Sequence, residues 1–393
     1  MKTLALCISE LSRRALSGLT IALLIAACGR GTTVDPIDAA GSESASSDQT
    51  FSKLASTNSA NAAIIADLEN RVGAIYNVDW VEGISQDAGV DMYYRWPGID
   101  GLVDLYQATG KSTHIDRAVA MALRYLSLGQ DLNEDGYLDW FSRFIDDHSH
   151  AHVEIRAADG IARITEILHT DNALTARYET EAQVFLDYLE KDVWEKAEVG
   201  AFNAQNMLET NVTHFIGRSG LIAVSLYRIT GKEKYLNWIE SKGSNLKEAL
   251  VLGANGAYTF NCYLDGSSCT GGEIIDTSHA GDTINFIVEA HRAGLVFDAV
   301  DIERLIGTVR KHLWNGSLSS PKFNDLVDGS GIFGGMGRNQ GGWVKLAAFD
   351  DELRSLYHAW IQSPDLVPLS PTFSVTRGTR VHILGNLAKA YLE

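Results

Sequence analysis

A Ser-His-Ala triplet occurs twice in the chain, around His150 and around His279. Each copy precedes a long segment whose apolar residues recur at helical spacing, and His214 opens another such segment between them. Counting from Tyr94 through these three histidines to Asn339, the steps are 56, 64, 65 and 60 residues. A polar cluster that recurs at this step predicts a repeated structural unit. The polar end of each unit is expected to face one common site.

The residues at this phase of the repeat have side chains that bind carboxylates and transfer protons near neutral pH. Asn211 and His214, like His279 and Asp282, are spaced i, i+3 and would share one face of a helix. We therefore expect a set of side chains to face one opening. Its members are Tyr93, Tyr94, Arg95, Trp96, His150, His152, Asn211, His214, His279, Asp282, Arg338, Asn339 and Trp343.

The segments that carry these residues are predicted to be helical nearly throughout. The motif Leu-Tyr-x-x-Thr-Gly-Lys occurs at 105–111 and again at 226–232. In both copies the glycine supplies the left-handed turn that ends one helix before the next begins. Small residues recur at a similar step of about 60 residues, at Gly101, Gly160, Gly220, Asp282 and Gly342. About five or six helical hairpins then fit between residue 60 and the C-terminus.

Repeated helical hairpins either stack into an open superhelix or close into a ring. We expect closure, because the unit is longer than the repeats of the common helical solenoids. The pattern resembles the (α/α) toroids of carbohydrate-active enzymes. The resemblance covers residues 59–393 and implies an all-α fold, an (α/α) toroid or incomplete barrel of about five to six hairpins, as a single catalytic domain.

Within that class, the Asn-His pair resembles the toroidal alginate-lyase type of polysaccharide lyase. The resemblance implies β-elimination on a uronate-containing polysaccharide. In those lyases the Asn and His are adjacent, whereas two residues separate them here. The catalytic residues it implies are His214, His279, Tyr94, Asn211 and Arg338, with Arg95 and Tyr258 as alternatives for the arginine and tyrosine. Those it implies for substrate binding are Arg95, Trp96, His150, His152, Asp282, Asn339 and Trp343.

Two alternatives stay open at this point. The first is a glycoside hydrolase on the same ring, which needs two carboxylates. Its candidates are Asp91, Glu154, Glu209, Asp276 and Asp282. The second is a glycan-binding lipoprotein without activity. In each case we expect a monomer that binds a polysaccharide, most simply an acidic one. We expect no organic cofactor.

A calcium-like loop is the one candidate metal site. Asp131, Asn133, Asp135 and Asp139 occupy positions 1, 3, 5 and 9 of a loop with glycine at position 6. Position 12 is Ser142 instead of the usual glutamate. The loop therefore indicates a possible Ca²⁺ site, and a plain Asp-Gly turn fits the same residues.

The N-terminal residues 1–27 have a basic leader and a short apolar run, as a signal peptide does. The run ends in Ile-Ala-Ala-Cys28, which resembles the lipobox of bacterial lipoproteins and implies cleavage and lipidation at Cys28. Residues 28–58 are rich in Gly, Ser, Thr, Ala and Asp and are expected to form a flexible tether. We expect a lipid-anchored protein at the outer membrane, the periplasmic face or the cell surface.

The chain is acidic and carries few cysteines. Its formal charge is −17, which disfavours nucleic acid as a partner and limits the membrane interaction to the lipid anchor. Beyond the leader and Cys28, the remaining cysteines are Cys262 and Cys269. In an oxidising compartment, a pair at this spacing across a Gly/Ser turn predicts a disulfide.

Overall fold

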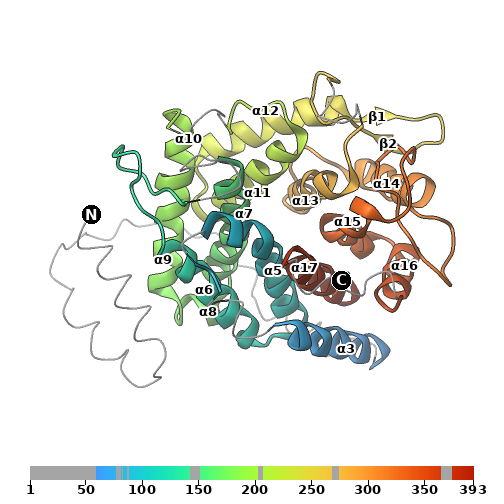
Figure 1. Ribbon diagram of the computed structural model, residues 1–393, viewed down its shortest axis with the longest axis horizontal. Helices are drawn as coiled ribbons and strands as arrows, with labels where there is room; N and C mark the ends of the chain where they lie inside the picture. The colour runs from blue at the N-terminus through green and yellow to red at the C-terminus, as the bar shows by residue number, and fades with distance from the viewer. Residues whose placement is uncertain are drawn as a thin grey trace, which may run out of the picture. The chain divides into compact units, whose positions relative to one another are not determined.

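The computed structural model describes residues 59–76, 81, 83–85, 88–141, 151–201, 207–267, 274–363 and 374–393 (Figure 1). The chain divides into two units, Met1–Ala62 and Ala63–Glu393, and the helical ring belongs to the second. The predicted signal peptide, Cys28 and tether lie outside the described residues. No helix of the described part is long and apolar enough to cross a membrane.

The second unit is an (α/α) toroid, as the sequence predicts. Within the described residues, six inner segments contact one another in cyclic order, and the last packs against the first (Figure 1). They are α5 (Ala88–Thr109), α7 (Ala151–Thr170), α11 (Thr213–Thr230), α13 (Thr277–Arg292), α15 (Gly341–Val344) with the 3₁₀ helix η6 (Lys345–Phe349), and α17 (Ser374–Leu392).

An outer layer of helices packs around these inner segments. Most outer elements directly follow their inner partner along the chain, so that the two form a hairpin. They are α6 (Ser112–Leu126), α8 (Asn172–Thr175), α9 (Glu179–Asp187) with the π-helix η3 (Tyr188–Glu195) and α10 (Lys196–Glu198), α12 (Glu233–Ala249), α14 (Ala299–Thr308) with the π-helix η4 (Val309–Leu313), and α16 (Asp351–Ile361). Helix α3 (Ser59–Ile75) completes the layer from the N-terminal side, since Arg71 donates to Gln362 next to α16.

Regular β-structure in the described residues is confined to β1 (Val251–Leu252) and β2 (Tyr258–Thr259), which pair antiparallel. The short 3₁₀ helix η5 (Gly335–Arg338) leads into α15. A hydrophobic core fills the space between the inner and outer layers. The all-α prediction is therefore confirmed.

The two Thr-Gly turns have the same geometry, as their shared motif predicts. Gly110 has φ +69° and Gly231 has φ +64°, the left-handed conformation that glycine adopts without strain. The amide of each glycine donates to the carbonyl four residues earlier, that of Tyr106 at 2.7 Å and that of Tyr227 at 2.8 Å. In both turns the preceding threonine hydroxyl also donates to the carbonyl four residues before it. These contacts end α5 and α11 in the same way.

Ring closure depends on backbones that pass one another without side chains. A Cβ on Gly385 of α17 would overlap the carbonyl of Gly101 on α5. Likewise, a Cβ on Gly342 of α15 would overlap the carbonyl of Gly281 on α13. Two of the recurring small residues, Gly101 and Gly342, thus lie where neighbouring inner helices are closest.

A buried ion network links the inner helices about three turns beyond the N-terminal ends of α5, α7 and α13. Asp100 of α5 contacts Arg163 of α7 at 3.1 Å, Lys345 of η6 at 3.1 Å and His382 of α17 at 2.7 Å. Lys345 also contacts Glu289 of α13 at 3.2 Å. Burial alone would raise the pKa of Asp100, but the surrounding cations hold it well below its ordinary value. Charges from five inner segments therefore meet inside the ring.

We predict that replacing Gly385 with alanine destabilises the ring. The added methyl group meets the backbone of α5, so the cost should match or exceed the roughly 1–3 kcal/mol typical of overpacking. The matched control is Gly73→Ala, because Gly73 lies in helix α3 with no atom within 4 Å of an added Cβ. That change should stabilise the protein by up to about 1 kcal/mol. Unfolding in urea measures both, and an equal effect of the two changes would contradict the close crossing.

Candidate active site

The N-terminal ends of the inner helices surround a narrow cleft with a cavity volume of about 10 Å³. The chain reaches the cleft from α5, α7, α13, α17 and the segment around α15. Its lining residues are Trp96, Pro97, Arg156, Ser278, Gly281, Asp282, Asn339, Gly341, Gly342 and His382. Among the described residues, Asp282 is the only carboxylate in this lining.

Asp282 is held by two arginines from neighbouring inner helices. Arg218 of α11 donates to its Oδ2 from Nε at 2.9 Å and from Nη2 at 2.5 Å. Arg156 of α7 lies 3.8 Å from the same oxygen. Nη1 of Arg218 lies 2.8 Å from Nδ1 of His152, which must be the acceptor because a guanidinium only donates. One buried carboxylate thus organises side chains of three helices.

Asp159 is a second carboxyl group near this cluster, three residues beyond Arg156 on the same face of α7. Its residue is 1% exposed, and neither of its side-chain oxygens has a hydrogen-bond partner among the described residues. Burial, and then the negative charge of Asp282, raise the pKa of Asp159 well above its ordinary value. Asp159 therefore carries a proton under conditions in which an exposed aspartate has lost it.

The structure also brings together three histidines from three inner helices. The ring centres of His214 and His279 lie 4.6 Å apart, and those of His152 and His214 lie 6.1 Å apart. Nδ1 of His279 lies 2.5 Å from Oδ2 of Asp276, the residue that also caps the start of α13. Burial, and then the charge of Arg218, hold the pKa of His214 well below its ordinary value, so His214 is neutral.

Aromatic and basic residues of α5 complete the mouth. The guanidinium of Arg156 lies over the ring of Tyr93 at 4.1 Å and over that of Trp96 at 5.3 Å. Tyr94 packs edge-on against Tyr93 at 5.2 Å, and burial raises the pKa of Tyr94. Arg95 points elsewhere, since it donates to the carbonyl of Gly83.

Several predicted site residues lie apart from this cluster. Helix α11 begins at Thr213, so the exposed Asn211 precedes the helix and does not share a face with His214. Trp343 is fully buried and donates to the carbonyl of Thr277, so it has no face for a sugar.

Asn339, in contrast, lines the cleft as predicted and donates to the hydroxyl of Ser278.

The remaining candidates have other partners or fall outside the described part. Tyr258 donates to Asp301 in the outer layer, and Glu154 forms a buried ion pair with Lys196 at 2.9 Å. Asp91 accepts from Ser85, and Glu209 is exposed. The side chain of Arg338, and all of His148, His150 and Cys269, lie outside the described residues. The disulfide of Cys262 therefore stays a prediction.

Arg156, Asp159 and Arg218 are among the site residues that were not predicted. A signal for them exists in the sequence, because Arg156 and Asp159 follow His152 at i+4 and i+7, and Arg218 follows His214 at i+4. Each is a charged side chain on the helical face that a predicted site histidine already marks.

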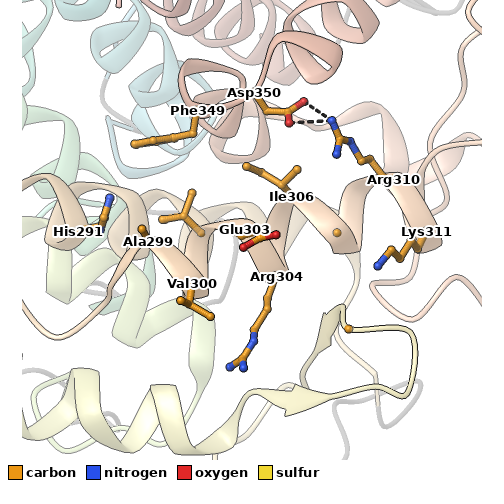
Figure 2. A pocket seen from close by; sticks show the side chains of 13 residues that line it. His291, Ala299, Val300, Glu303, Arg304, Ile306, Arg310, Lys311, Phe349 and Asp350 are labelled. Atoms are coloured by element: carbon orange, nitrogen blue, oxygen red, sulfur yellow. Dashed lines mark hydrogen bonds and ion pairs between the residues drawn. The ribbon is translucent and has the colours of Figure 1, made fainter.

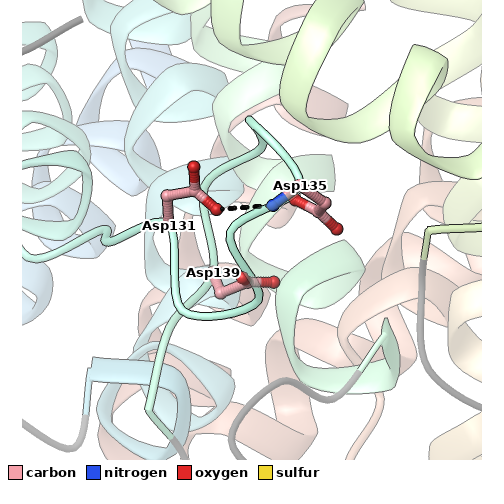
Figure 3. Close-up of side chains that lie close together, drawn as sticks. All are labelled: Asp131, Asp135 and Asp139. Atoms are coloured by element: carbon pink, nitrogen blue, oxygen red, sulfur yellow. Dashed lines mark hydrogen bonds between the residues drawn. The ribbon is translucent and has the colours of Figure 1, made fainter.

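The calcium-like loop is closed by its own hydrogen bonds (Figure 3). Oxygens of Asp131, Asp135 and Asp139 lie within 4.8 Å of one another. Asp131 accepts from the amide of Asp135 at 3.0 Å, and Asp139 contacts the buried ammonium of Lys196 at 2.6 Å. The carboxylate of Asp139 thus already has a cationic partner, and Ca²⁺ at this loop stays a prediction.

A larger hollow of about 580 Å³ lies in the outer layer, along α14 (Figure 2). Arg310 forms an ion pair with Asp350 at 2.7 Å across its rim, and Lys311 donates to the carbonyl of Asn255. None of the clustered mouth residues lines it. We therefore place the candidate active site at the smaller cleft of the ring mouth, where convergent charged groups and perturbed pKa values coincide.

A fold of this type, with a polar mouth formed by inner helices, is that of the (α/α) toroid carbohydrate-active enzymes. No family model matches the chain, and no curated protein matches it. Among solved structures, the chain is similar to an inactive variant of the alpha-1,6-mannanase GH76A of Salegentibacter sp. HEL1_6 in complex with alpha-1,6-mannotetrose. Identity is 15%, with 84% of this chain and 99% of that chain covered and a TM-score of 0.49. The GH76A alpha-1,6-mannanase structure itself gives 15% identity, 76% and 90% coverage and a TM-score of 0.45.

The prediction of a polysaccharide lyase of the alginate-lyase type is wrong. The solved structures that resemble the chain are glycoside hydrolases. The physical reason for the error is local. The lyase prediction depended on an Asn-His pair on one helix, and Asn211 lies before the start of α11.

We predict that Asp159→Asn stabilises the protein at neutral pH. The folded state keeps the Asp159 proton, whereas the unfolded chain releases it near the ordinary pKa of 3.8. Wild type therefore loses stability as pH rises from about 4 toward the raised pKa of the folded state. Asparagine does not titrate and avoids this loss.

The stabilisation by Asp159→Asn should be largest at pH 7 and should fade toward pH 4. Melting temperatures from pH 4 to 8 measure it. Asp351→Asn is the matched control, because that side chain is 94% exposed. A lower melting temperature of Asp159→Asn at pH 7 would mean that Asp159 is ionised in the folded protein.

Proposed function

We propose that the chain is a glycoside hydrolase that cleaves a polysaccharide at the mouth of the ring. One observation carries this proposal: two carboxyl groups near the same cleft have opposite environments. Asp282 is paired with guanidinium groups, while burial keeps the proton on Asp159. Glycosidic bond hydrolysis requires one carboxylic acid and one carboxylate, and environments that differ in this way separate the two roles.

In this scheme Asp159 is the general acid. It donates its proton to the glycosidic oxygen as the bond to the anomeric carbon breaks. Asp282 is the carboxylate that either removes a proton from the attacking water or attacks the anomeric carbon itself. Arg218 and Arg156 both contact Oδ2 of Asp282, and we assign Oδ1 to the water or the substrate. No organic cofactor takes part in these steps.

A second candidate is a glycan-binding protein without turnover. The observation that favours it is the 1% exposure of Asp159, which must become accessible to protonate a bound sugar. Both candidates use the same cleft and the same type of partner.

We predict that Asp159→Asn and Asp282→Asn each lower kcat by about 10²- to 10⁴-fold, the usual contribution of an acid or base in the transition state. The purified protein is incubated with a panel of neutral glycans, alpha-1,6-mannan among them, and uronate-containing glycans. New reducing ends are measured together with the ultraviolet absorbance of unsaturated uronate products.

Asp159→Asn is the more informative of the two variants, since we expect it to be at least as stable as wild type. Glu303→Gln in the outer hollow is the matched control and should keep full activity. Reducing ends that Asp159→Asn leaves unchanged would contradict the acid role. Binding without any cleavage would favour the second candidate.

A further inference from the structure

We infer that the cleft binds a hexuronic acid residue of the substrate through Arg156. This inference rests on the proposed function and concerns the same site. It begins with the charges of the described part of the cleft lining, in which Asp282 is the only carboxylate, and Arg156 and His382 are the basic groups. His382 already contacts Asp100 at 2.7 Å, and Asp282 is bound more closely by Arg218 than by Arg156.

Arg156 is thus the cation of the cleft with the weakest anionic partner. Its distance of 3.8 Å from Asp282 is longer than a hydrogen bond. The residue is 6% exposed, and its Nε has no hydrogen-bond partner among the described residues. A guanidinium that is removed from water without full pairing is costly, unless a ligand supplies the missing acceptor.

The cleft lining contains a second buried donor without a hydrogen-bond partner among the described residues. The indole nitrogen of Trp96 is buried and has no partner in the part of the chain that the structure describes. Trp96 lies under the guanidinium of Arg156, whose other neighbour is the ring of Tyr93. Two residues that line one cleft therefore each carry a buried, unpaired donor, which suits a ligand group made only of acceptors.

A carboxylate fits these donors better than other acceptor groups do. The guanidinium is planar and held against two aromatic rings, so its edge can make the paired contacts that a carboxylate accepts. A neutral hydroxyl would leave Arg156 with the distant carboxylate of Asp282 as its anionic partner in the described lining. Asp276, the other carboxylate of the mouth, already accepts from His279 and from two backbone amides, and it does not line the cleft.

The test compares uronate oligosaccharides with their carboxyl-reduced neutral counterparts by titration calorimetry. All measurements use the Asp159→Asn background, in which the ligand is not consumed. We expect the uronate form to bind more tightly, and Arg156→Gln to lower its association constant by about 10- to 100-fold. The neutral form should lose little, and Arg156→Lys should retain part of the preference.

Arg304→Gln is the matched control, since Arg304 contacts Tyr258 in the outer layer. It should leave both association constants unchanged. Equal binding of uronate and neutral forms, a preference for sulfated neutral sugars, or a preference that survives Arg156→Gln would overturn the inference. Binding does not require turnover. If wild type prefers the uronate form but cleaves neither form, the proposed function is contradicted and the inference is not. Cleavage of neutral and uronate glycans alike contradicts the inference alone.

Discussion

The contacts of Asp100 with Arg163, Lys345 and His382 hold the ring in one register. A buried ion pair adds little net stability, because desolvation offsets most of the attraction, but a misplaced charge costs several kcal/mol. The network therefore penalises any arrangement in which an inner helix slides or the ring stays open. It also forms the floor of the site, since His382 both contacts Asp100 and lines the cleft.

Between this floor and the mouth, Asp159 differs from the carboxylates of the network. Asp100 and Glu289 have cationic partners that hold their pKa values down, whereas Asp159 is buried without any hydrogen-bond partner among the described residues. The fold thus stabilises the ionised carboxylates of Asp100 and Glu289 in the buried network. Nearer the mouth it keeps Asp159 protonated. Local violations of this kind are most common where function requires them.

The fold was predictable because its causes are local. The two Leu-Tyr-x-x-Thr-Gly turns each end a helix, and small residues at a regular step mark the crossings that a ring needs, as at Gly101 and Gly342. The site was predictable only in part. That His214 and His279 approach each other follows from equal phase in the repeat, whereas Asn211 stays outside α11 because a β-bridge of Val212 with Tyr263 extends the chain there. The acid role of Asp159 depends on burial and on Asp282 of another helix, which no local pattern encodes.

The two proposals meet at the Oδ2 atom of Asp282. At this oxygen the carboxylate contacts the guanidinium groups of both Arg218 and Arg156. Of the two, Arg156 is the more distant, and it is also the one we assign to the substrate carboxylate. When Arg156 pairs with a bound uronate, its long contact with Asp282 weakens, and Asp282 keeps Arg218 as its cationic partner. The charge of Arg156 by itself lowers the pKa of Asp159, so pairing Arg156 with a uronate favours the protonated form that the acid role needs. Recognition of the sugar and the protonation of the acid would then depend on the same arginine.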